Sequence, residues 1–429
     1  MRLNHPERNA GKALVVIVGA GFAGLSAAKR LAGHAGVHVV LIDQRNHHLF
    51  QPLLYQVATA GLNPADIAVP IRSQFRHVDN VEVHLGRVEG VDLADRVICG
   101  GGRELVYDYL VLACGAGHSY FGRDEWEPYA PGLKSLEQAT EIRRRIFAAF
   151  ELAENELDRS RQEALLTFVV VGGGPTGVEL AGAIADICHT ALKGDFRRID
   201  PDNARVVLIE AGPRILASFP ASLSTRAVRD LEQLGVDVRA GTRVENIDAK
   251  GVVINGQRLA SHTVVWAAGV RAASLNLNPS VETDRAGRLR VGSDCSIPGH
   301  PNVFVAGDMA SFETAKGTTL PGVAPVAMQS GCHAAESILR DLNNQQRTAF
   351  FYRDKGQMAT IGRSRAIVKT NRLTLTGRFA WLAWLFVHVW NLVGFRNRAA
   401  VVFQWAWNYV FSRRESRLIT GGLVVSEES

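Results

Sequence analysis

Runs of β-branched and other apolar residues that end in glycine turns recur along the chain. Residues 13–18 lead into Gly19-Ala20-Gly21-Phe22-Ala23-Gly24, and residues 168–171 lead into Gly172-Gly173-Gly174-Pro175-Thr176-Gly177. A helix-like segment follows each turn. A strand, a glycine turn and a helix in this order bind a dinucleotide, because the turn lets the backbone approach the pyrophosphate and the helix N-terminus faces its charge. Two such units in one chain predict two nucleotides held against each other.

The strand that follows each glycine unit ends in an acid. The first unit continues through a helix over 23–32 to a strand over 37–42, which ends at Asp43, where this fold binds ribose hydroxyls. The second unit continues through a helix, an inserted loop over 194–203 and a strand that closes on Glu210. A carboxylate at this position repels a ribose 2′-phosphate, so Glu210 favours NADH. The nearby Arg214 leaves NADPH open.

The remaining pattern predicts further strands over 81–88, 106–115, 263–269 and 303–308, and a helix over 135–157. The stretch 46–75, with its prolines and aromatic residues, predicts a loop-rich segment packed over a cofactor. The strand at 303–308 ends in Asp308, which suits hydrogen bonds to a flavin ribitol or phosphate and equally suits an ordinary turn.

Composition restricts the class of protein. A chain of 429 residues with 47% apolar and 21% charged residues predicts two or three globular domains. The five cysteines are odd in number and form no CxxC pair, so neither a disulfide framework nor a metal site is expected, and a reducing compartment is favoured. The first apolar run leads directly into a glycine turn, which indicates a strand and not the core of a signal peptide.

Positive charge is concentrated near the C-terminus. Residues 361–420 contain ten basic residues and one acid, Glu415. Because the whole chain carries only +6, the rest of it, including the nucleotide-binding part, is mildly acidic. We therefore expect no nucleic-acid partner. The same region holds two aromatic-rich apolar stretches, 379–390 and 399–411. Each is shorter than the roughly 20 apolar residues of a membrane span. We therefore predict helices lying in the plane of an anionic lipid surface, with a dimer interface or a hairpin packed on the body as the alternative.

The order of these segments resembles the type II NADH dehydrogenases, the single-subunit, non-pumping NADH:quinone oxidoreductases. The most specific part of the resemblance is the run Asn46-His-His-Leu-Phe-Gln-Pro-Leu-Leu-Tyr-Gln-Val-Ala-Thr59, and the likeness extends over nearly the whole chain. It implies an α/β fold with two Rossmann-like domains, the NADH domain inserted into the FAD domain, and a C-terminal membrane-associating helical segment. The implied boundaries are 12–118 and 283–345 for FAD, 119–282 for NADH and 346–429 for the C-terminal region.

The resemblance also implies which residues meet the cofactors. FAD would contact the first glycine turn, its acid and several strand ends, namely Gly19, Gly21, Phe22, Ala23, Gly24, Asp43, Val88, Gly115, Asp308 and Ala327. NADH would contact the second turn and its surroundings, namely Gly172, Gly174, Gly177, Glu179, Glu210 and Gly269. Glu179 is expected to act near the two reacting rings; the alternative is a helix N-terminal acid stabilised by the helix dipole.

The expected quinone site consists of Ala324, Pro325 and Gln329. Relatives commonly have Ala-Gln where this chain has Ala324-Pro325, which leaves Gln329 as the catalytic amide, while a proline at 325 suits a helix start. The implied reaction passes hydride from NADH to FAD and two electrons to a membrane quinone. A homodimer joined by the C-terminal helices, peripheral on the cytoplasmic face of the inner membrane, is the expected assembly.

Three other functions keep some of these features. A sulfide:quinone oxidoreductase has the same layout but needs cysteines near the flavin, for which Cys114 and Cys332 are candidates. A disulfide reductase needs a CxxxxC pair after Asp43, and this chain lacks one. A non-catalytic protein that senses flavin or NAD at a membrane would keep both glycine turns.

Overall fold

The computed structural model describes residues 11–313, 319–411 and 416–420. The chain divides into two compact units, each built from separate stretches of sequence. Unit 1 comprises residues up to 49, 68–117 and 270–354, and unit 2 comprises 50–67, 118–269 and the residues from 355 onward. Each unit has its own parallel sheet and its own apolar core.

The centre of unit 1 is strand β1 (Ala13–Val18), whose residues are buried except at its first position. It pairs in parallel with β2 and β9. Burial on both faces explains why the strand is a continuous apolar run and not an alternating one. The six-stranded sheet has the order β21 (Ser296–Ile297), β22 (His300–Val305), β9 (Tyr109–Leu112), β1, β2 (Val37–Asp43) and β5 (Val81–Leu85).

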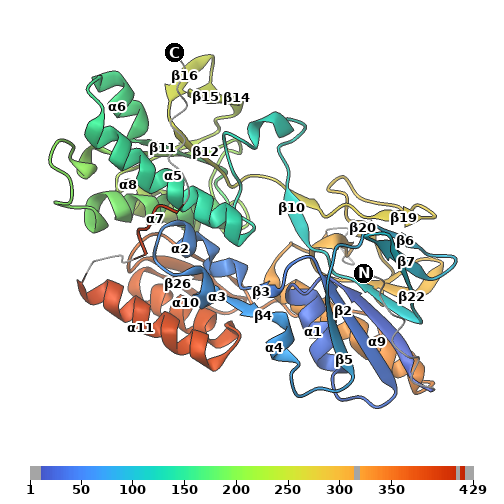
Figure 1. Ribbon diagram of the computed structural model, residues 1–429. Helices are drawn as coiled ribbons and strands as arrows, with labels where there is room; N and C mark the ends of the chain where they lie inside the picture. The colour runs from blue at the N-terminus through green and yellow to red at the C-terminus, as the bar shows by residue number, and fades with distance from the viewer. Residues whose placement is uncertain (1–10, 314–318, 412–415, 421–429) are drawn as a thin grey trace. The chain divides into compact units, whose positions relative to one another are not determined.

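Helices α1 (Phe22–Leu31) and α9 (Ala324–Leu342) pack side by side on this sheet (Figure 1). Small residues permit their close approach. A Cβ added to Gly331 would lie 2.1 Å from the carbonyl oxygen of Ala23. The first glycine turn is therefore held between β1 and the two helices.

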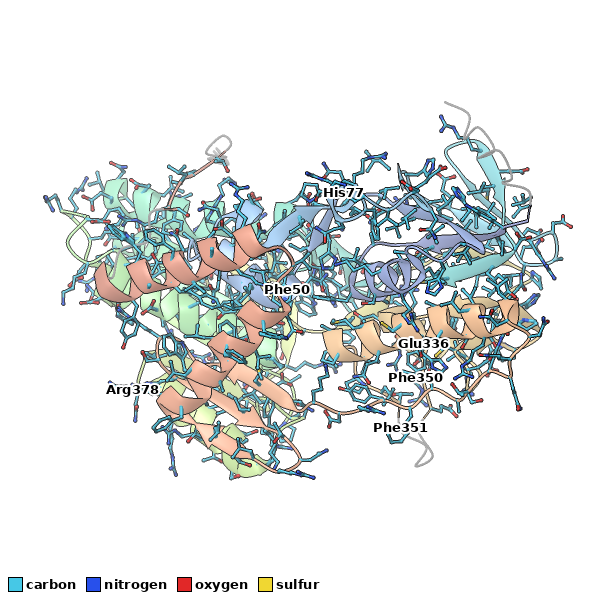
Figure 2. The ribbon with its side chains drawn as sticks, turned by 90° about the horizontal axis from the view of Figure 1, so that it is seen from below. Phe50, His77, Glu336, Phe350, Phe351 and Arg378 are labelled. Carbon is cyan, nitrogen blue, oxygen red and sulfur yellow. The ribbon has the colours of Figure 1, made fainter. Side chains whose placement is uncertain are left out.

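Smaller elements complete unit 1. Phe350 packs against Phe312 and His333, with ring centroids 5.1 and 5.4 Å apart, and Figure 2 marks it beside Glu336 of α9.

The remaining strands form short sheets: β19 (Asn276–Asn278) with β6 (Gly90–Asp92), β7 (Val97–Gly100) and β8 (Arg103–Val106); β3 (His47–Leu49) with β4 (Ala68–Pro70); and β20 (Leu289–Arg290) with β23 (Ala310–Ser311). Helix α4 (Ile71–Gln74) follows β4, and β10 (Ala116–His118) and β18 (Val270–Ala272) lie where the chain passes from one unit to the other.

Unit 2 repeats the Rossmann pattern around β11 (Thr167–Val171), which is fully buried. The four parallel strands have the order β13 (Val236–Ala240), β12 (Arg205–Glu210), β11 and β17 (Thr263–Trp266). The helices are α5 (Leu136–Asn155), α6 (Arg159–Leu165), α7 (Pro175–Asp186) and α8 (Ala221–Glu232), and β14 (Val244–Asp248), β15 (Gly251–Ile254) and β16 (Gln257–Ala260) form an antiparallel sheet. Together the two units confirm the predicted α/β class.

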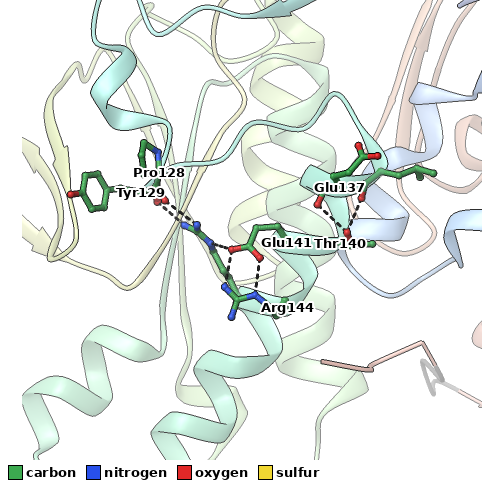
Figure 3. Close-up of polar contacts among 8 residues, drawn as sticks. Pro128, Tyr129, Glu137, Thr140, Glu141 and Arg144 are labelled. Carbon is green, nitrogen blue, oxygen red and sulfur yellow. Dashed lines mark hydrogen bonds and ion pairs between the residues drawn. The ribbon is translucent and has the colours of Figure 1, made fainter. Parts of the chain in front are cut away.

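Helix α5 begins where a side chain can cap it. The hydroxyl of Ser135 accepts a hydrogen bond from the backbone N–H of Gln138, which satisfies a donor that the first helical turn leaves free. Further along, Glu141 forms ion pairs of 2.7 Å with both Arg144 and Arg145, and Arg145 also binds the carbonyl oxygen of Pro128 (Figure 3). These contacts attach the helix to the loop that precedes it.

The C-terminal part of unit 2 contains more than the two predicted helices. An antiparallel sheet of β24 (Gln357–Thr360), β25 (Ala366–Lys369) and β26 (Thr374–Thr376) precedes helices α10 (Gly377–Asn391) and α11 (Phe395–Phe411). The local pattern does not reveal this sheet, because its strands are short and polar at several positions. No helix in the described part of the chain is long and apolar enough to cross a membrane.

Several predicted elements differ in detail, and the strands predicted over 106–115, 263–269 and 303–308 have the bounds of β9, β17 and β22. The stretch 46–75 is not loop-rich, because it holds β3, β4, α4, α2 (Leu54–Ala58), α3 (Pro64–Ile67) and a 3-10 turn at Gln51–Leu53. Strand β5 ends at Leu85 and not at residue 88. The helix after the second glycine turn ends at Asp186 and continues as one π-helical turn, Ile187–Ala191.

Candidate functional site

The first glycine turn, in unit 1, has the geometry that a dinucleotide requires. Gly19 has a φ of +99°, and a Cβ there would lie 2.3 Å from the carbonyl oxygen of Ala113. A Cβ on Gly24 would lie 1.7 Å from the carbonyl oxygen of Gly19, so both positions exclude any side chain. Gly21 differs, because no atom lies within 4 Å of an added Cβ. That open space at a helix N-terminus is where a pyrophosphate can approach the backbone.

Asp43 closes this turn from the end of β2. Its Oδ2 accepts a hydrogen bond of 2.6 Å from the backbone N–H of Ala20, and its Oδ1 accepts one of 2.7 Å from Arg45. Each carboxylate oxygen has a second lone pair, so Asp43 can still accept a ribose hydroxyl.

A histidine that sequence analysis did not single out supports the same turn. His48 is buried, its Nδ1 lies 2.9 Å from the carbonyl oxygen of Ala20, and its ring meets that of Phe22 edge-on at 5.2 Å. Burial lowers the pKa of His48, so the ring is neutral at physiological pH. The signal was the His-His pair in the family run 46–59.

The other expected FAD residues lie around the same end of the sheet in unit 1. Gly307 follows β22 with a φ of +71°, and its added Cβ would lie 3.2 Å from Ala23 and 3.3 Å from Ala327. Asp308 comes next and lies against Gly322, whose added Cβ would be 3.3 Å from the carboxylate. Gly115 follows β9 with a φ of +74°, and Val88 follows β5 as a partly buried residue of the core. The side chains of Ala23 and Ala327 are buried, so a cofactor could reach these residues mainly through their backbone.

The second glycine turn, in unit 2, reproduces the first. Gly172 has a φ of +113°, and a Cβ on Gly177 would lie 1.8 Å from the carbonyl oxygen of Gly172. Gly174, like Gly21, has open space around an added Cβ. Glu210 accepts hydrogen bonds of 2.6 Å from the N–H groups of Gly173 and Gly212. Its carboxylate therefore faces the turn from the end of β12.

Gly269, the last expected NADH residue, follows β17 in unit 2. It has a φ of +71°, and a Cβ there would lie 2.5 Å from the carbonyl oxygen of Ser119. A side chain is excluded at this position by the neighbouring backbone as well as by the torsion.

Glu179 lies in the second turn of α7 and lines a cavity of about 130 Å³ within unit 2. Aromatic residues of α10 and α11 form much of the wall, including Trp381, Trp384, Trp405 and Tyr409. Burial raises the pKa of Glu179 to about 8, although the backbone N–H of Thr360, 3.3 Å from its Oε1, and the nearby indole of Trp384 act in the opposite direction. The carboxyl group is therefore mostly protonated at neutral pH and can donate a hydrogen bond or a proton.

The expected quinone residues lie at the start of α9 in unit 1. Ala324 and Pro325 are the first two residues of the helix, where proline is tolerated because its missing N–H has no intrahelical partner. Gln329 uses both ends of its amide: Nε2 donates to the carbonyl oxygen of Arg353 at 3.1 Å, and Oε1 accepts from the N–H of Arg353 at 2.9 Å. In this conformation Gln329 joins α9 to the segment before β24.

Cys114 follows β9 beside the first glycine turn. Its sulfur lies 3.8 Å from the carbonyl oxygen of Val18, and burial raises its pKa to about 12. A thiol in this setting stays protonated and is a poor nucleophile. Among the described residues, no cluster of histidine, cysteine, aspartate and glutamate has the arrangement of a metal site.

Comparison with known families agrees with this geometry. Residues 13–331 match the pyridine nucleotide-disulphide oxidoreductase family, and residues 355–414 match the NDH2 C-terminal domain. The second match covers the C-terminal sheet and the whole of helices α10 and α11.

Similarity to individual proteins supports the same assignment. The chain is 44% identical over 422 residues to the type II NADH:quinone oxidoreductase Ndh of Mycobacterium tuberculosis, covering 95% of this chain and 90% of that protein. The structure of NDH2 from Plasmodium falciparum in complex with NADH has a similar fold, with a TM-score of 0.86 at 19% identity over 94% of this chain and 99% of that one. The sulfide:quinone oxidoreductase of Aquifex aeolicus is less similar in fold, with a TM-score of 0.69 at 19% identity over 93% and 95% of the two chains. By its sequence and both matched regions, this chain belongs to the pyridine nucleotide-disulphide oxidoreductases and, within them, to the type II NADH:quinone oxidoreductases.

Proposed function

We propose that this chain oxidises NADH and reduces a quinone through a bound FAD. The observation that carries the proposal is the repeated turn geometry, in which each unit has a glycine turn with open space and an acid bound to the turn's backbone. One dinucleotide site would suit many proteins. Two sites in a type II NADH:quinone oxidoreductase favour electron transfer between their ligands.

FAD fits the turn of unit 1. Gly21 leaves room for the pyrophosphate at the N-terminus of α1, Asp43 can accept ribose hydroxyls, and Asp308 can accept further hydroxyls of the ribitol. Gly19, Phe22, Ala23, Gly24, Val88, Gly115 and Ala327 would complete the contacts. When bound, FAD supplies the hydride acceptance and two-electron transfer that no side chain of the protein can perform.

NADH fits the turn of unit 2. Gly174 leaves room for its pyrophosphate, and the fixed carboxylate of Glu210 would accept the ribose hydroxyls and repel a 2′-phosphate. Gly172, Gly177 and Gly269 hold the backbone in conformations and close contacts that exclude a side chain.

Glu179 is well suited to hold a proton. Quinone reduction consumes two protons, and a carboxyl group with a pKa of about 8 is protonated at neutral pH but can still release its proton. The cavity beside it is aromatic on the side of α10 and α11. In unit 1 the proposed quinone residues are Ala324, Pro325 and Gln329, and Gln329 would have to exchange its bonds to Arg353 for bonds to the substrate.

Helices α10 and α11 would attach the enzyme to anionic lipid on the cytoplasmic face of the inner membrane. Phe386 and Trp390 of α10 are each 66% exposed, as is Phe403 of α11, and Arg378 lies in the first turn of α10 (Figure 2). Exposed rings beside cations are typical of a helix that lies in a lipid interface. A homodimer through the same helices and the domain boundaries 12–118, 119–282, 283–345 and 346–429 complete the proposal.

Anaerobic titration of the purified protein with NADH tests this function. We expect bound FAD whose absorbance near 450 nm is lost on addition of about one equivalent of NADH and recovers on addition of a short-chain quinone. Reduction by sulfide but not by NADH would support the sulfide-oxidising alternative. Absence of bleaching by either donor would leave only a binding role.

A further inference from the structure

A series of hydrogen bonds within unit 2 leads from helix α11 towards Glu179. The indole N–H of Trp405 donates to Oε1 of Gln56 at 2.6 Å, and Nε2 of Gln56 donates to the hydroxyl of Tyr55 at 3.0 Å. The Tyr55 hydroxyl lies 3.0 Å from Oγ1 of Thr360. The backbone N–H of Thr360 is the group that meets the Glu179 carboxyl.

The direction of these bonds is determined by Gln56. Its amide oxygen accepts from Trp405 and its amide nitrogen donates to Tyr55, so the tyrosine oxygen acts as acceptor there, while either hydroxyl can donate in the bond between Tyr55 and Thr360. Tyr55 and Thr360 are buried, 7% and 3% exposed, and a buried polar group that loses its partner is costly. A change at one position of the series therefore disturbs the next.

Helix α11 is held on the same segment along its length. Asn408 Nδ2 donates to the carbonyl oxygen of Gly61 at 3.1 Å, and Asn397 Nδ2 donates to those of Ala65 and Asp66 at 3.1 and 3.0 Å. These bonds fix α11 relative to α2, where Tyr55 and Gln56 lie. Aromatic contacts reinforce the arrangement, because the ring centroid of Trp384 lies 5.7 Å from that of Trp405 and 6.4 Å from that of Tyr55.

We propose that Trp405, Gln56 and Tyr55 are positioning residues for Glu179, through which the placement of helix α11 on the enzyme sets how the carboxyl holds its proton. The inference rests on the proposed catalytic role of Glu179 and goes beyond it. It gives α11 a second task besides contact with lipid: its buried face holds the Thr360 N–H against the carboxyl. None of the three residues needs to touch a cofactor.

Two conservative substitutions test the proposal on the FAD-loaded enzyme. Tyr55→Phe keeps the ring and removes the hydroxyl, and Trp405→Phe keeps an aromatic side chain, smaller than the indole, and removes the indole N–H. Weakening the contact of Thr360 with Glu179 removes a group that favours the charged carboxylate. We therefore expect the alkaline limb of the kcat profile, measured from pH 6 to 10 with a short-chain quinone, to move up by about 0.5 pH unit or more. The KM for NADH should stay within about twofold.

Tyr129→Phe is the matched control, because it also removes a tyrosine hydroxyl but at a position that is 42% exposed and lies outside the series, and its profile should equal that of the parent. Combining Trp405→Phe with Glu179→Gln separates positioning from general loosening. If Trp405 acts through Glu179, the double variant has the kcat and profile of Glu179→Gln alone, since effects along one series are not additive.

The two proposals fail in different ways. A parent-like alkaline limb in Glu179→Gln would overturn the role of Glu179 itself. Loss of the limb in Glu179→Gln, with unshifted profiles in both phenylalanine variants, would overturn the positioning role alone. Bound FAD and thermal unfolding confirm that each variant is folded, and if Tyr55→Phe does not fold, Trp405→Phe decides the question.

Discussion

The Oε2 atom of Glu210 lies 2.6 Å from the backbone nitrogen of Gly173, the second residue of its glycine turn. In the other unit Oδ2 of Asp43 lies at the same distance from the backbone nitrogen of Ala20, also the second residue of its turn. The acid at the end of the second strand thus has a structural task before any ribose binds: it holds the turn by a charge-assisted hydrogen bond. Each carboxylate keeps further lone pairs with which it can accept a hydrogen bond from a ribose hydroxyl.

Replacing Glu210 by glutamine should weaken the preference for NADH. The variant keeps one acceptor oxygen for the backbone but loses the charge that repels a 2′-phosphate, so we expect the ratio of kcat/KM for NADPH over NADH to rise at least about tenfold. Steady-state rates with both nucleotides measure it. Glu232→Gln, at an exposed position on α8, serves as the control, and an unchanged ratio would remove Glu210 from the ribose site.

Gly174→Ala should impair NADH binding without disturbing the fold. No atom lies within 4 Å of the added Cβ, and the φ of −72° suits alanine, so the fold should be kept; because Gly174 is the N-cap of α7, where alanine is less favourable than glycine, stability should fall by about 1 kcal/mol at most. The methyl group would occupy the space proposed for the pyrophosphate, and the KM for NADH should rise more than about tenfold. Bound FAD should be unchanged. Gly36→Ala, another glycine with open space, should alter neither property; a parent-like KM in Gly174→Ala would argue against the assignment.

The free energy of unfolding should depend on pH through the titration of Glu179. Its pKa is about 8 in the folded state and about 4.3 in an unfolded chain. A raised folded-state pKa gives a contribution to stability that is complete below about pH 4 and is lost as the pH rises towards 8. Glu179→Gln has no such titration, so its free energy of unfolding should gain on the parent by up to about 1.4 kcal/mol per pH unit between pH 5 and 8. Denaturant unfolding of both proteins at several pH values measures the gain, and parallel curves would show an ordinary, solvated carboxylate.

Membrane attachment should depend on the exposed rings of α10. Replacing both Phe386 and Trp390 by serine removes apolar surface that is already in contact with solvent, so folding should be little affected. We expect binding to anionic vesicles to fall at least tenfold, because each buried ring contributes about 1.5–3 kcal/mol. Leu157→Ser, at an 83% exposed position outside these helices, provides the comparison. Vesicle sedimentation that did not distinguish the two variants would place the lipid contact elsewhere.

Removing the thiol of Cys114 should leave the reaction intact. With a pKa of about 12 the sulfur is protonated, and Cys114→Ala should keep NADH:quinone activity within about twofold. Sulfide should not reduce the flavin of either protein. A severe loss of turnover in the variant, with FAD still bound, would show that the thiol takes part in the reaction and would favour the sulfide-oxidising alternative.

The sequence alone determined the α/β class, the two nucleotide units, their acids and the family. The reason is local: Gly19 and Gly24 stand where backbone torsion and contact forbid a side chain, and buried strands such as β1 must be continuously apolar. The positive φ of Gly19 and the contact of Gly24 with Gly19 arise within a single turn, so these constraints can be read along the chain.

Contacts between distant stretches were decided only by the tertiary structure. Tyr55 reaches Thr360 and Trp405 reaches Gln56 across more than 300 positions, and nothing in the local pattern pairs them. The pKa of Glu179 likewise comes from burial in unit 2, near Thr360 and Trp384, and the expected amide of Gln329 proved to be bound to Arg353. Hydrogen bonding and burial depend on which residues the fold brings together, and these contacts cannot be predicted from the spacing of residues along the chain.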